Sequence, residues 1–363
     1  MQKTSIKDGA SYAPVGKAEQ VVAPNEFCFS VAFLDHGHIN GQTNGLLQAG
    51  ATLRYVFDTD AQKLKEFCER YPQAIVADSF EQILADSETR LVASAAIPNL
   101  RAYIGRQVML ANKDYFTDKS PFTTLEQLKQ IRQVVKDTQR IYSVYYAERI
   151  HNEAAWQAGE LIKQGAIGKV IHVLNVAPHR LAKHKRPDWF FDKAAYGGIL
   201  TDIGSHQVEQ FLCYADATNV DINFARVANL NNPDNPELED FGEMSMTSSN
   251  GASFYSRVDW FTPQGQKTWG DGRTFILGTK GSIECRKYND IARQAPASTL
   301  FLTDESGEHE VDCLGQSSFP FFGQLILDCI NRTETSMSQE HVFKAAELSM
   351  LAQQMADEAN TRG

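Results

Sequence analysis

The sequence lacks the cysteine spacing of a disulfide framework or of a zinc site. Its six cysteines are scattered along 363 residues, and no two of them form a CxxC pair. Thiols placed in this way are typical of reduced, buried side chains, so we expect a cytoplasmic protein. The polar opening, MQKTSIKDGASYAPVGKAEQ, also lacks the apolar core of a secretion signal.

Long apolar runs and an excess of basic residues are absent as well. The longest apolar stretches fall short of the roughly 18 residues that a membrane-spanning helix requires. The 35 basic residues are outnumbered by 45 acidic ones, and the net charge of -10 argues against a nucleic-acid partner. We therefore expect a small molecule or another protein as the partner, and neither a membrane nor a nucleic acid.

What the sequence does contain is a regular alternation of strand and helix patterns in its first half. Short β-rich runs, each followed by a helical pattern, predict strands at 27–33, 52–58, 74–77, 91–96, 114–118 and 141–146. Alternation at this spacing produces right-handed βαβ units. We predict that residues 27–148 form an α/β Rossmann domain with a parallel sheet, in which Thr123 and Glu126 make a helix capping box.

The residues on either side of this domain follow other patterns. Residues 1–26 are a polar arm, which is either a disordered tail or an arm that wraps a neighbouring subunit. Residues 149–363 predict an α+β domain with a large, mainly antiparallel open sheet, because paired strand patterns surround turn residues such as Asn250 and Gly251. Helices are expected at 152–165, 198–214, 319–331 and 338–358. The last helix is a candidate for packing back on the first domain.

The FLDHGHING loop after the first predicted strand is the expected phosphate-binding position. In a parallel α/β sheet a pyrophosphate binds at the N-terminus of the first helix, where free backbone amides point at it. The GxGxxG motif is incomplete here, and the expected contacts are His36, Gly37, His38 and Ile39, with the amides of the last two as donors. An alternative is that Asp35, His36 and His38 ligate a metal ion together with a further residue. Since neither an HExxH motif nor a Cys/His cluster is present, we expect no metal site.

An acidic residue at the end of the second strand points to the same cofactor. Asp58 lies 21 residues after Gly37, where a carboxylate accepts hydrogen bonds from the hydroxyls of an adenosine ribose. Because an acid there would repel a 2′-phosphate, we expect NAD rather than NADP. The alternative is that Asp58 or Asp60 only caps the helix that follows.

The stretch YGGILTDIGSHQVEQ, residues 196–210, is the strongest candidate for a catalytic segment. Asp202 and His206 are four residues apart and therefore share one face of the expected helix. In such an acid–base pair the carboxylate orients the imidazole, and the ring accepts a proton from a substrate hydroxyl. Taken alone, the same spacing also fits a purely structural hydrogen bond.

Polar and aromatic residues precede this stretch. The segment 177–193 offers His179, Arg180 and Trp189, which suit a polyhydroxylated or anionic ligand. A solvated basic loop with one buried aromatic side chain is the alternative interpretation. Tyr145, at the end of the last strand of the first domain, is a further candidate for contact with the substrate.

Four motifs resemble those of the Gfo/Idh/MocA oxidoreductase family. GGILTDIGSH matches its Gly-Gly-x-Leu-x-Asp-x-Gly-x-His pattern, and LVASAAIPN resembles its strand that ends in Pro98 and Asn99. FTDKSP is similar to its Val-Glu-Lys-Pro segment, which makes Lys119 the family lysine, and FILGTKGSIE is similar to a strand turn of its second domain. The motifs follow one another in the family order, and the resemblance covers residues 27–355.

The resemblance implies an enzyme that transfers a hydride between NAD or NADP and a sugar-like polyol or its keto form. It places Pro98, Asn99 and Lys119 at the cofactor. It puts Lys119 between nicotinamide and substrate, and it directs Asp202 and His206 at the reacting hydroxyl. It also implies a homodimer or homotetramer formed through the sheet of the second domain. An NAD-using glycosidase or lyase and a non-catalytic regulator that binds dinucleotide or sugar remain as alternatives.

Overall fold

The first half of the chain forms a six-stranded parallel sheet. The computed structural model describes residues 14–291, 295–296 and 298–361. The strand order is β3-β2-β1-β4-β5-β6. The bounds are Cys28–Ala32 for β1, Thr52–Phe57 for β2, Ile75–Val76 for β3, Thr89–Ser94 for β4, Asp114–Asp118 for β5 and Tyr142–Tyr145 for β6. The order reverses between β1 and β4, the point at which doubly wound sheets bind ligands. The predicted Rossmann-type sheet is confirmed.

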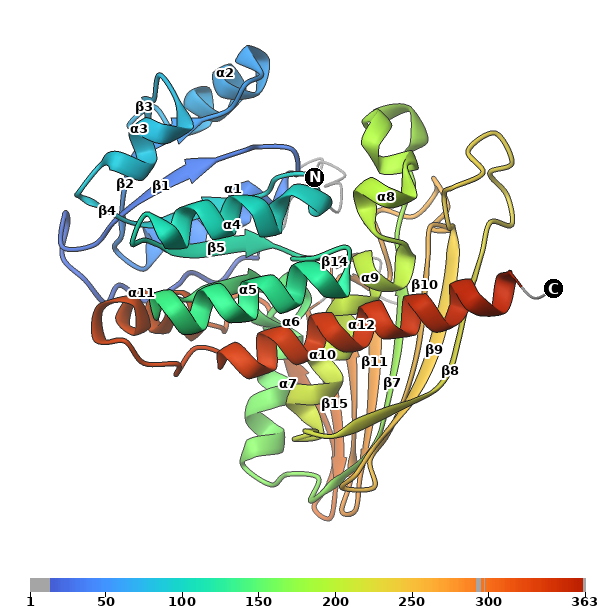
Figure 1. Ribbon diagram of the computed structural model, residues 1–363. Helices are drawn as coiled ribbons and strands as arrows, with labels where there is room; N and C mark the ends of the chain where they lie inside the picture. The colour runs from blue at the N-terminus through green and yellow to red at the C-terminus, as the bar shows by residue number, and fades with distance from the viewer. Residues whose placement is uncertain (1–13, 292–294, 297, 362–363) are drawn as a thin grey trace.

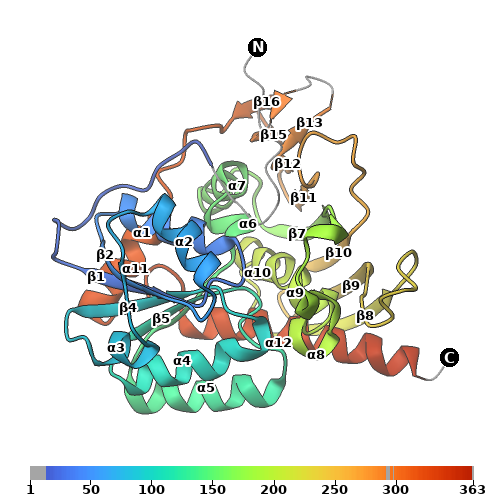
Figure 2. The ribbon, with the colours of Figure 1, turned by 90° about the horizontal axis from the view of Figure 1, so that it is seen from above.

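Helices cover both faces of this sheet (Figure 2). They are α1 His38–Gln48, α2 Ala61–Arg70, α3 Phe80–Ala85, α4 Arg101–Leu110, which follows the 3-10 turn η1 Pro98–Leu100, and α5 Leu125–Thr138. Helices α4 and α5 lie side by side on one face, and α1 lies on the other. All residues of β1 and β5 are buried, so the strand ends that carry the expected site are held by a packed core.

The capping box of α5 lies one residue later than predicted. The Thr124 hydroxyl accepts a hydrogen bond from the Gln127 amide, and the Gln127 side chain accepts one from the Thr124 amide. Thr123 and Glu126 do not form the box, because the N-cap residue of the helix is Thr124 and its third helical residue is Gln127. A glutamine in that position can act as the reciprocal acceptor just as a glutamate can.

The second sheet has eight strands in the order β16-β15-β12-β11-β7-β10-β9-β8. The bounds are β7 Val170–Pro178, β8 Val220–Ala228, β9 Phe241–Ser248, β10 Ser253–Asp259, β11 Arg273–Gly278, β12 Ser282–Arg286, β15 Thr299–Asp304 and β16 Gly307–Asp312; β13 Asn289–Asp290 and β14 Ala295–Pro296 form a separate pair. Neighbours are antiparallel except β7 and β10. The predicted turn joins β9 to β10, with Gly251 at φ 91°, a conformation that favours glycine. The mainly antiparallel sheet is confirmed.

Helices pack on one face of the second sheet and leave the other face open (Figure 1). The helical segments between β6 and β8 are α6 Ala147–Ile150, α7 Glu153–Lys163, η2 Lys183–Lys185, η3 Asp188–Phe191, α8 Lys193–Tyr196, α9 Ile199–Asp202 and α10 Gly204–Tyr214. The single helix predicted over 198–214 is therefore interrupted at Ile203, where the His206 amide bonds to the Ile203 carbonyl. Every second residue of β9 is buried, as expected for a sheet with one covered face.

The last two helices return to the first domain. Helix α11, Pro320–Asn331, packs on α1, where a side chain on Gly45 would collide with the Phe322 ring. Arg332 forms an ion pair with Asp114 of β5. Helix α11, which lies in the segment expected to form the second domain, therefore packs on the first domain. Helix α12, Gln339–Asn360, spans both halves and contacts α5 and β6 as well as α10 and β8 (Figure 1).

Part of the polar N-terminal arm is packed against its own chain. The amides of Val15 and Gly16 donate to Glu153 Oε1 at 3.0 and 3.1 Å, and the Val21 amide donates to the Ala49 carbonyl. Residues 14–26 are therefore ordered against their own chain and do not form a disordered tail. The rest of the arm, residues 1–13, lies outside the described residues.

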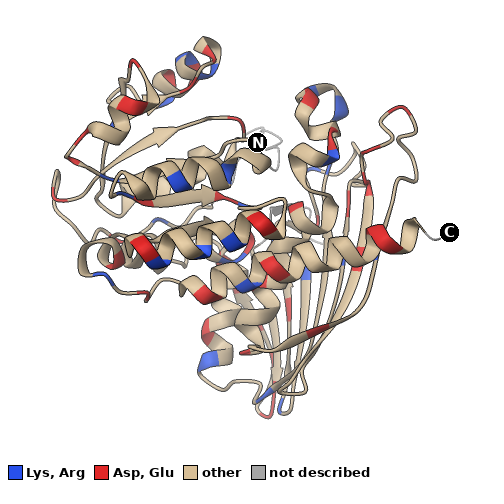
Figure 3. Ribbon diagram, viewed as in Figure 1, with Lys and Arg blue, Asp and Glu red and all other residues tan. Residues whose placement is uncertain are grey.

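Charges of both signs are mixed on the outer helices. Figure 3 shows Lys and Arg beside Asp and Glu along α5 and α12, and Arg132 of α5 pairs with Glu340 of α12. None of the helices in the described ranges is long and apolar enough to cross a bilayer.

Candidate active site

A cavity lies between the two domains, beyond the carboxyl end of β5. Its lining residues are His36, His38, Pro98, Arg101, Lys119, Glu148, His179, Arg180, Arg186, Trp189, Phe190, Asp202, His206, Trp260 and Trp269. Most of the predicted site residues are in this set, and Gly37 lines an adjoining hollow. Besides Gly37, four predicted residues are not in the lining, namely Ile39, Asp58, Asn99 and Tyr145. The structure therefore brings the predicted catalytic residues from both domains to one cavity.

Lys119 and Asp202 form an ion pair across this cavity. Lys119 directly follows β5, and its Nζ lies 2.6 Å from Asp202 Oδ1 at the end of α9. Burial alone would raise the pKa of Asp202, but the Lys119 ammonium outweighs burial and holds that pKa below its usual value. Asp202 is therefore an anion at neutral pH, and its carboxylate fixes the position of the Lys119 ammonium.

His206 does not pair with Asp202. The side chain is 2% exposed, and its Nδ1 is buried without a hydrogen-bond partner among the described residues. Burial lowers the pKa of His206 to about 3 although the Glu148 carboxylate opposes the shift, so the ring is neutral. The prediction that Asp202 orients this imidazole is wrong, because the carboxylate is directed at Lys119 instead.

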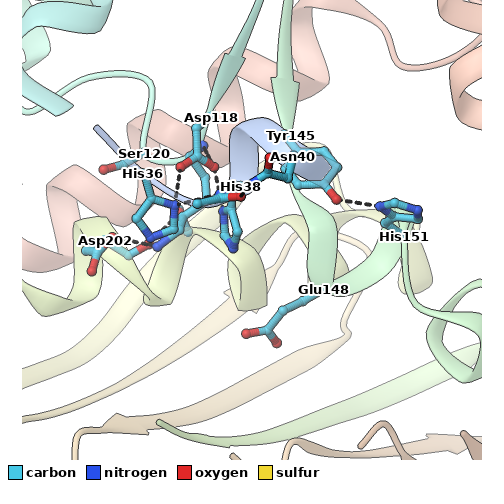
Figure 4. A network of polar contacts seen from close by, with 12 residues as sticks. His36, His38, Asn40, Asp118, Ser120, Tyr145, Glu148, His151 and Asp202 are labelled. Carbon is cyan, nitrogen blue, oxygen red and sulfur yellow. Dashed lines mark hydrogen bonds and ion pairs between the residues drawn. The ribbon is translucent and has the colours of Figure 1, made fainter. Parts of the chain in front are cut away.

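A buried carboxylate, Asp118, ties the FLDHGHING loop to the end of β5 (Figure 4). Its two oxygens lie 3.0 Å from His36 Nδ1 and 2.8 Å from His38 Nδ1. Arg101 Nη2 lies 3.2 Å from the first of these oxygens, and the Lys119 amide donates to the other at 2.8 Å. Burial would raise the pKa of Asp118, but His38, Arg101 and His36 outweigh it and hold the pKa well below its usual value. The loop and the segment that carries Lys119 are thus fixed to one anion.

Asp35 takes no part in this cluster. Its carboxylate lies 2.6 Å from Lys63 Nζ and accepts a hydrogen bond from the Ile97 amide at 3.2 Å. The groups of metal-ligand type that lie together are His36, His38 and Asp118, so the alternative that included Asp35 does not match the geometry. Within this cluster the Asp118 carboxylate is also paired with the Arg101 guanidinium.

Arg101 holds the backbone around Lys119 in place. It is 1% exposed, and its Nε donates to the Ala96 carbonyl at 2.7 Å. Its Nη1 donates to the carbonyls of Lys119 and Ser120. The sequence pattern had not singled out this residue; an arginine in the first turn after Pro98 and Asn99, where the cofactor was expected, was the available signal.

The residues on the cofactor side lie at the ends of β1 and β2. Gly37 is the N-cap of α1, and the Ile39 side chain is buried in the core. The Asp58 carboxylate accepts hydrogen bonds from the amides of Leu34 at 2.7 Å and Asp60 at 2.8 Å. It is Asp60, not Asp58, that caps α2. The N-terminus of α1 has no side-chain cap, but the amides of His38 and Ile39, the predicted donors, already donate to His36 Nδ1 at 3.4 Å and to the His36 carbonyl at 3.2 Å. The helix N-terminus and the carboxylate that follows β2 lie where a doubly wound sheet places a dinucleotide.

The predicted substrate residues of segment 177–193 differ in their surroundings. Arg180 donates through Nη2 to the carbonyls of Pro263, Gln266 and Thr268, so this nitrogen is used to hold a neighbouring loop. Trp189 is half-buried at the rim. His179 is packed between two tryptophans and is described below. The Arg180 guanidinium, which was expected to bind an anion, thus already donates hydrogen bonds to backbone carbonyls through one of its nitrogens.

Tyr145 and Asn99 do not reach the cavity. Tyr145 is fully buried, and its hydroxyl is hydrogen-bonded to His151 (Figure 4). It packs on α1 so closely that a Cβ on Gly41 would lie 2.3 Å from the hydroxyl oxygen. The expectation that Tyr145 binds substrate is wrong because β6 turns this side chain into the core of the first domain. The Asn99 carbonyl accepts a hydrogen bond from Gln127, which anchors the turn after β4.

Comparison with known proteins assigns the chain to a family. The model of the oxidoreductase family with an NAD-binding Rossmann fold matches residues 35–146, and that of the GFO/IDH/MocA C-terminal domain matches residues 156–284. An oxidoreductase candidate of known structure from Erwinia carotovora atroseptica is 44% identical, has a TM-score of 0.88, and is covered over 99% of its chain and 91% of this one. The chain belongs to the GFO/IDH/MocA family. The resemblance inferred from the four motifs is confirmed.

More distant GFO/IDH/MocA-like proteins share parts of the sequence or the fold. The D-xylose dehydrogenase of Paenarthrobacter nicotinovorans is 23% identical over 149 residues, which are 40% of this chain and 38% of that protein. A levoglucosan dehydrogenase in complex with NADH and levoglucosan is 16% identical, has a TM-score of 0.76, and is covered over 98% of its chain and 91% of this one. The NAD-binding Rossmann domain of this chain is shown by the family model over residues 35–146. The segment that matches the D-xylose dehydrogenase spans 38% of that protein.

Proposed function

We propose that this protein is an NAD-dependent oxidoreductase that transfers a hydride between nicotinamide and a sugar-like polyol or its keto form. The observation that carries the proposal is the Lys119–Asp202 ion pair, 2.6 Å long, in a cavity that neutral His206 also lines. A dehydrogenase must remove a proton from a hydroxyl as the hydride leaves the same carbon. The three side chains provide a cation and a proton acceptor at one place.

The proton steps follow from the state of each side chain. Bound nicotinamide supplies the hydride acceptor or donor. The Lys119 ammonium, held by Asp202, stabilises the negative charge that develops on the substrate oxygen. His206 has an unprotonated ring nitrogen at neutral pH, so it can accept the hydroxyl proton. Asp202 acts as the positioning residue for Lys119 and not for the imidazole.

The proposal includes NAD in preference to NADP. Asp58 directly follows β2 and is 6% exposed. Each of its two carboxylate oxygens accepts a hydrogen bond from a backbone amide. Additional negative charge from a 2′-phosphate would be repelled there. Titration calorimetry with the two cofactors tests this part, and tighter binding of NADP would contradict it.

Substitution of the proposed cation, Lys119, and of the proposed proton acceptor, His206, tests the reaction. Lys119→Ala and His206→Ala should each lower kcat for an accepted polyol by about 100-fold or more, measured as NADH absorbance over a panel of polyols. The Kd for NAD, measured by calorimetry, should stay within about threefold because phosphate and ribose contacts are elsewhere. Unchanged turnover in either variant would refute the assignment. Substrate cleavage without net NADH would favour the glycosidase or lyase, and cofactor binding without any turnover would favour the regulator.

We further propose that the open face of the second sheet forms the subunit interface of a homodimer or homotetramer. Strand register aligns one row of side chains across this face, none of which is fully buried: Phe224, Ser245, Tyr255, Leu174, Phe275, Glu284 and Phe301. A row that is mostly aromatic and apolar favours a protein partner. Light scattering should give a multiple of 40.5 kDa, and a monomer at micromolar concentration would contradict this part.

A further inference from the structure

The cavity contains a carboxylate that the proposed proton steps do not use. Glu148 of α6 is 1% exposed and lines the cavity. Its Oε2 lies 2.8 Å from both Lys287 Nζ and Gln207 Nε2, and each of these groups donates a hydrogen bond to it. Although burial alone would raise the pKa of Glu148, Lys287 and two histidines lower it to about 2. Glu148 is therefore a buried anion with one oxygen fully engaged.

The other oxygen of Glu148 requires a donor. Oε1 is buried and has no hydrogen-bond partner in the described part of the chain. Leaving a buried acceptor unsatisfied is unfavourable, and more so when the group is charged. Because Glu148 lines the cavity, a ligand in this cavity is placed to provide the missing donor.

A second acceptor lies close to this oxygen. His179 Nε2 lies 3.6 Å from Glu148 Oε1. The other ring nitrogen, Nδ1, lies 3.1 Å from the Ala177 carbonyl, and since a carbonyl only accepts, Nδ1 carries the proton. In the neutral ring Nε2 is then an acceptor. Burial lowers the pKa of His179 to about 4 despite Glu148, which keeps the ring neutral near pH 7.

Aromatic side chains enclose these two acceptors. The His179 ring packs against Trp260 and Trp269, with centroid distances of 5.4 and 4.3 Å, and both tryptophans line the cavity. Aromatic faces suit the C–H face of a sugar ring. Two facing acceptors in such a pocket require two donors, which adjacent hydroxyl groups supply and a carboxylate or carbonyl does not.

We propose that Glu148 and His179 form a subsite that binds two neighbouring hydroxyl groups of an uncharged polyol and discriminates against ligands with an anionic group at this position. The subsite deepens the proposed function, on which it rests, by naming the chemical class of the substrate. Glu148 is the specificity-determining residue, and Lys287 and Gln207 are its positioning residues.

The test removes the charge of Glu148 together with that of its buried partner. Glu148→Gln/Lys287→Met avoids an unpaired charge, and Glu148→Gln alone provides the smaller change. Arg149→Met/Glu209→Gln is the matched control, because it removes a buried ion pair that does not line the cavity. Circular dichroism verifies that each variant is folded before ligands are compared.

Two readouts are taken with NAD present. Steady-state NADH absorbance gives KM and kcat for D-xylose, D-glucose, levoglucosan and myo-inositol as uncharged probes and for D-gluconate and D-glucose 6-phosphate as anionic probes. Tryptophan fluorescence gives binding of the same compounds without turnover, since Trp260 and Trp269 border the subsite. For the best uncharged probe, both Glu148 variants should raise KM about 10- to 100-fold, the effect of a lost charged hydrogen bond. The value of kcat should change much less, and the control should leave KM unchanged.

The outcomes separate the subsite from the hydride transfer. An unchanged KM in the Glu148 variants, or an anionic probe preferred by the wild type, would overturn the subsite. If no probe yields NADH, the proposed hydride transfer fails, and the fluorescence titration still decides the subsite. In that case, polyol binding that is weaker in the Glu148 variants than in the wild type supports the subsite. Equal binding in the variants and the wild type, or no binding to the wild type, overturns it.

Discussion

Lys287→Met should destabilise the protein strongly, because it leaves Glu148 as a buried anion without its cation. Both side chains are 1% exposed, and their charged atoms are 2.8 Å apart. Removing one partner of a buried ion pair costs about 3–5 kcal/mol of unfolding free energy. The pKa of Glu148 gives a similar magnitude: a decrease from 4.5 to about 2 corresponds to about 3 kcal/mol at 1.36 kcal/mol per pKa unit.

The pH dependence of this loss has a defined sign. In the wild type the pKa of Glu148 is lower in the folded than in the unfolded chain, so its stabilisation is complete above pH 4.5 and is lost as the pH falls towards about 2. In Lys287→Met, burial without the ammonium raises the pKa of folded Glu148 above 4.5. The unpaired anion then destabilises the variant at neutral pH, and protonation relieves it in acid. The difference between the two proteins should therefore be largest near pH 7 and decrease as the pH falls through the raised pKa of Glu148 in the variant. It should decrease further below about pH 4.5, where the wild type loses its own stabilisation.

Urea unfolding, followed by circular dichroism at pH 7 and pH 4, measures this difference. Glu148→Gln/Lys287→Met should recover most of the lost stability, since no unpaired charge remains. Lys163→Met, at an exposed ion pair of α7, is the control and should change stability by no more than about 0.5 kcal/mol. A loss below about 1 kcal/mol at pH 7, or a double variant as unstable as the single one, would refute the reasoning.

Two further predictions concern residues whose surroundings differ from the sequence-based expectation. Tyr145→Phe removes the hydroxyl bonded to His151 and should lower the unfolding free energy by about 0.5–1.5 kcal/mol, while KM for a polyol stays unchanged; an increase in KM would contradict the buried placement. Lys63→Met leaves Asp35 uncompensated beside the N-terminus of α1, so the Kd for NAD measured by calorimetry should rise about tenfold. The neighbouring Lys65→Met serves as its control, and an unchanged Kd in Lys63→Met would show that Asp35 does not act on the cofactor.

The fold was predictable because its information is local. Each strand of the first sheet is a short β-rich run between helical patterns, and the Asn250-Gly251 turn identifies its hairpin directly. The interruption at Ile203 lies directly before Gly204, a poor helix former, but the spacing of the apolar residues gave no sign of it. The return of α11 to the first domain depends on contacts such as Phe322 against Gly45, which join residues far apart in the sequence.

The sequence motifs identified which residues line the cavity. They did not identify which of these residues contact one another across it. The GGILTDIGSH motif predicted that Asp202 and His206 lie in one site with Lys119, and all three residues line the cavity. The motif did not predict that the Asp202 carboxylate pairs with Lys119, which is 83 residues away in the sequence. Glu148 and Lys287 are 139 residues apart, and no spacing rule connects them. All four residues of β6 are buried, so no alternation indicated which way Tyr145 points.

The unusual residues of the cofactor loop are coupled to one another and are not independent defects of a glycine motif. Asp35 stands where a small residue is expected, and its charge is compensated by Lys63 at 2.6 Å. His36 and His38 converge on Asp118, the residue before Lys119. This contact joins the loop to the end of β5, 80 residues later. The polar groups that depart from the motif are thus held by partners within the protein: Asp35 by Lys63, and His36 and His38 by the shared carboxylate of Asp118.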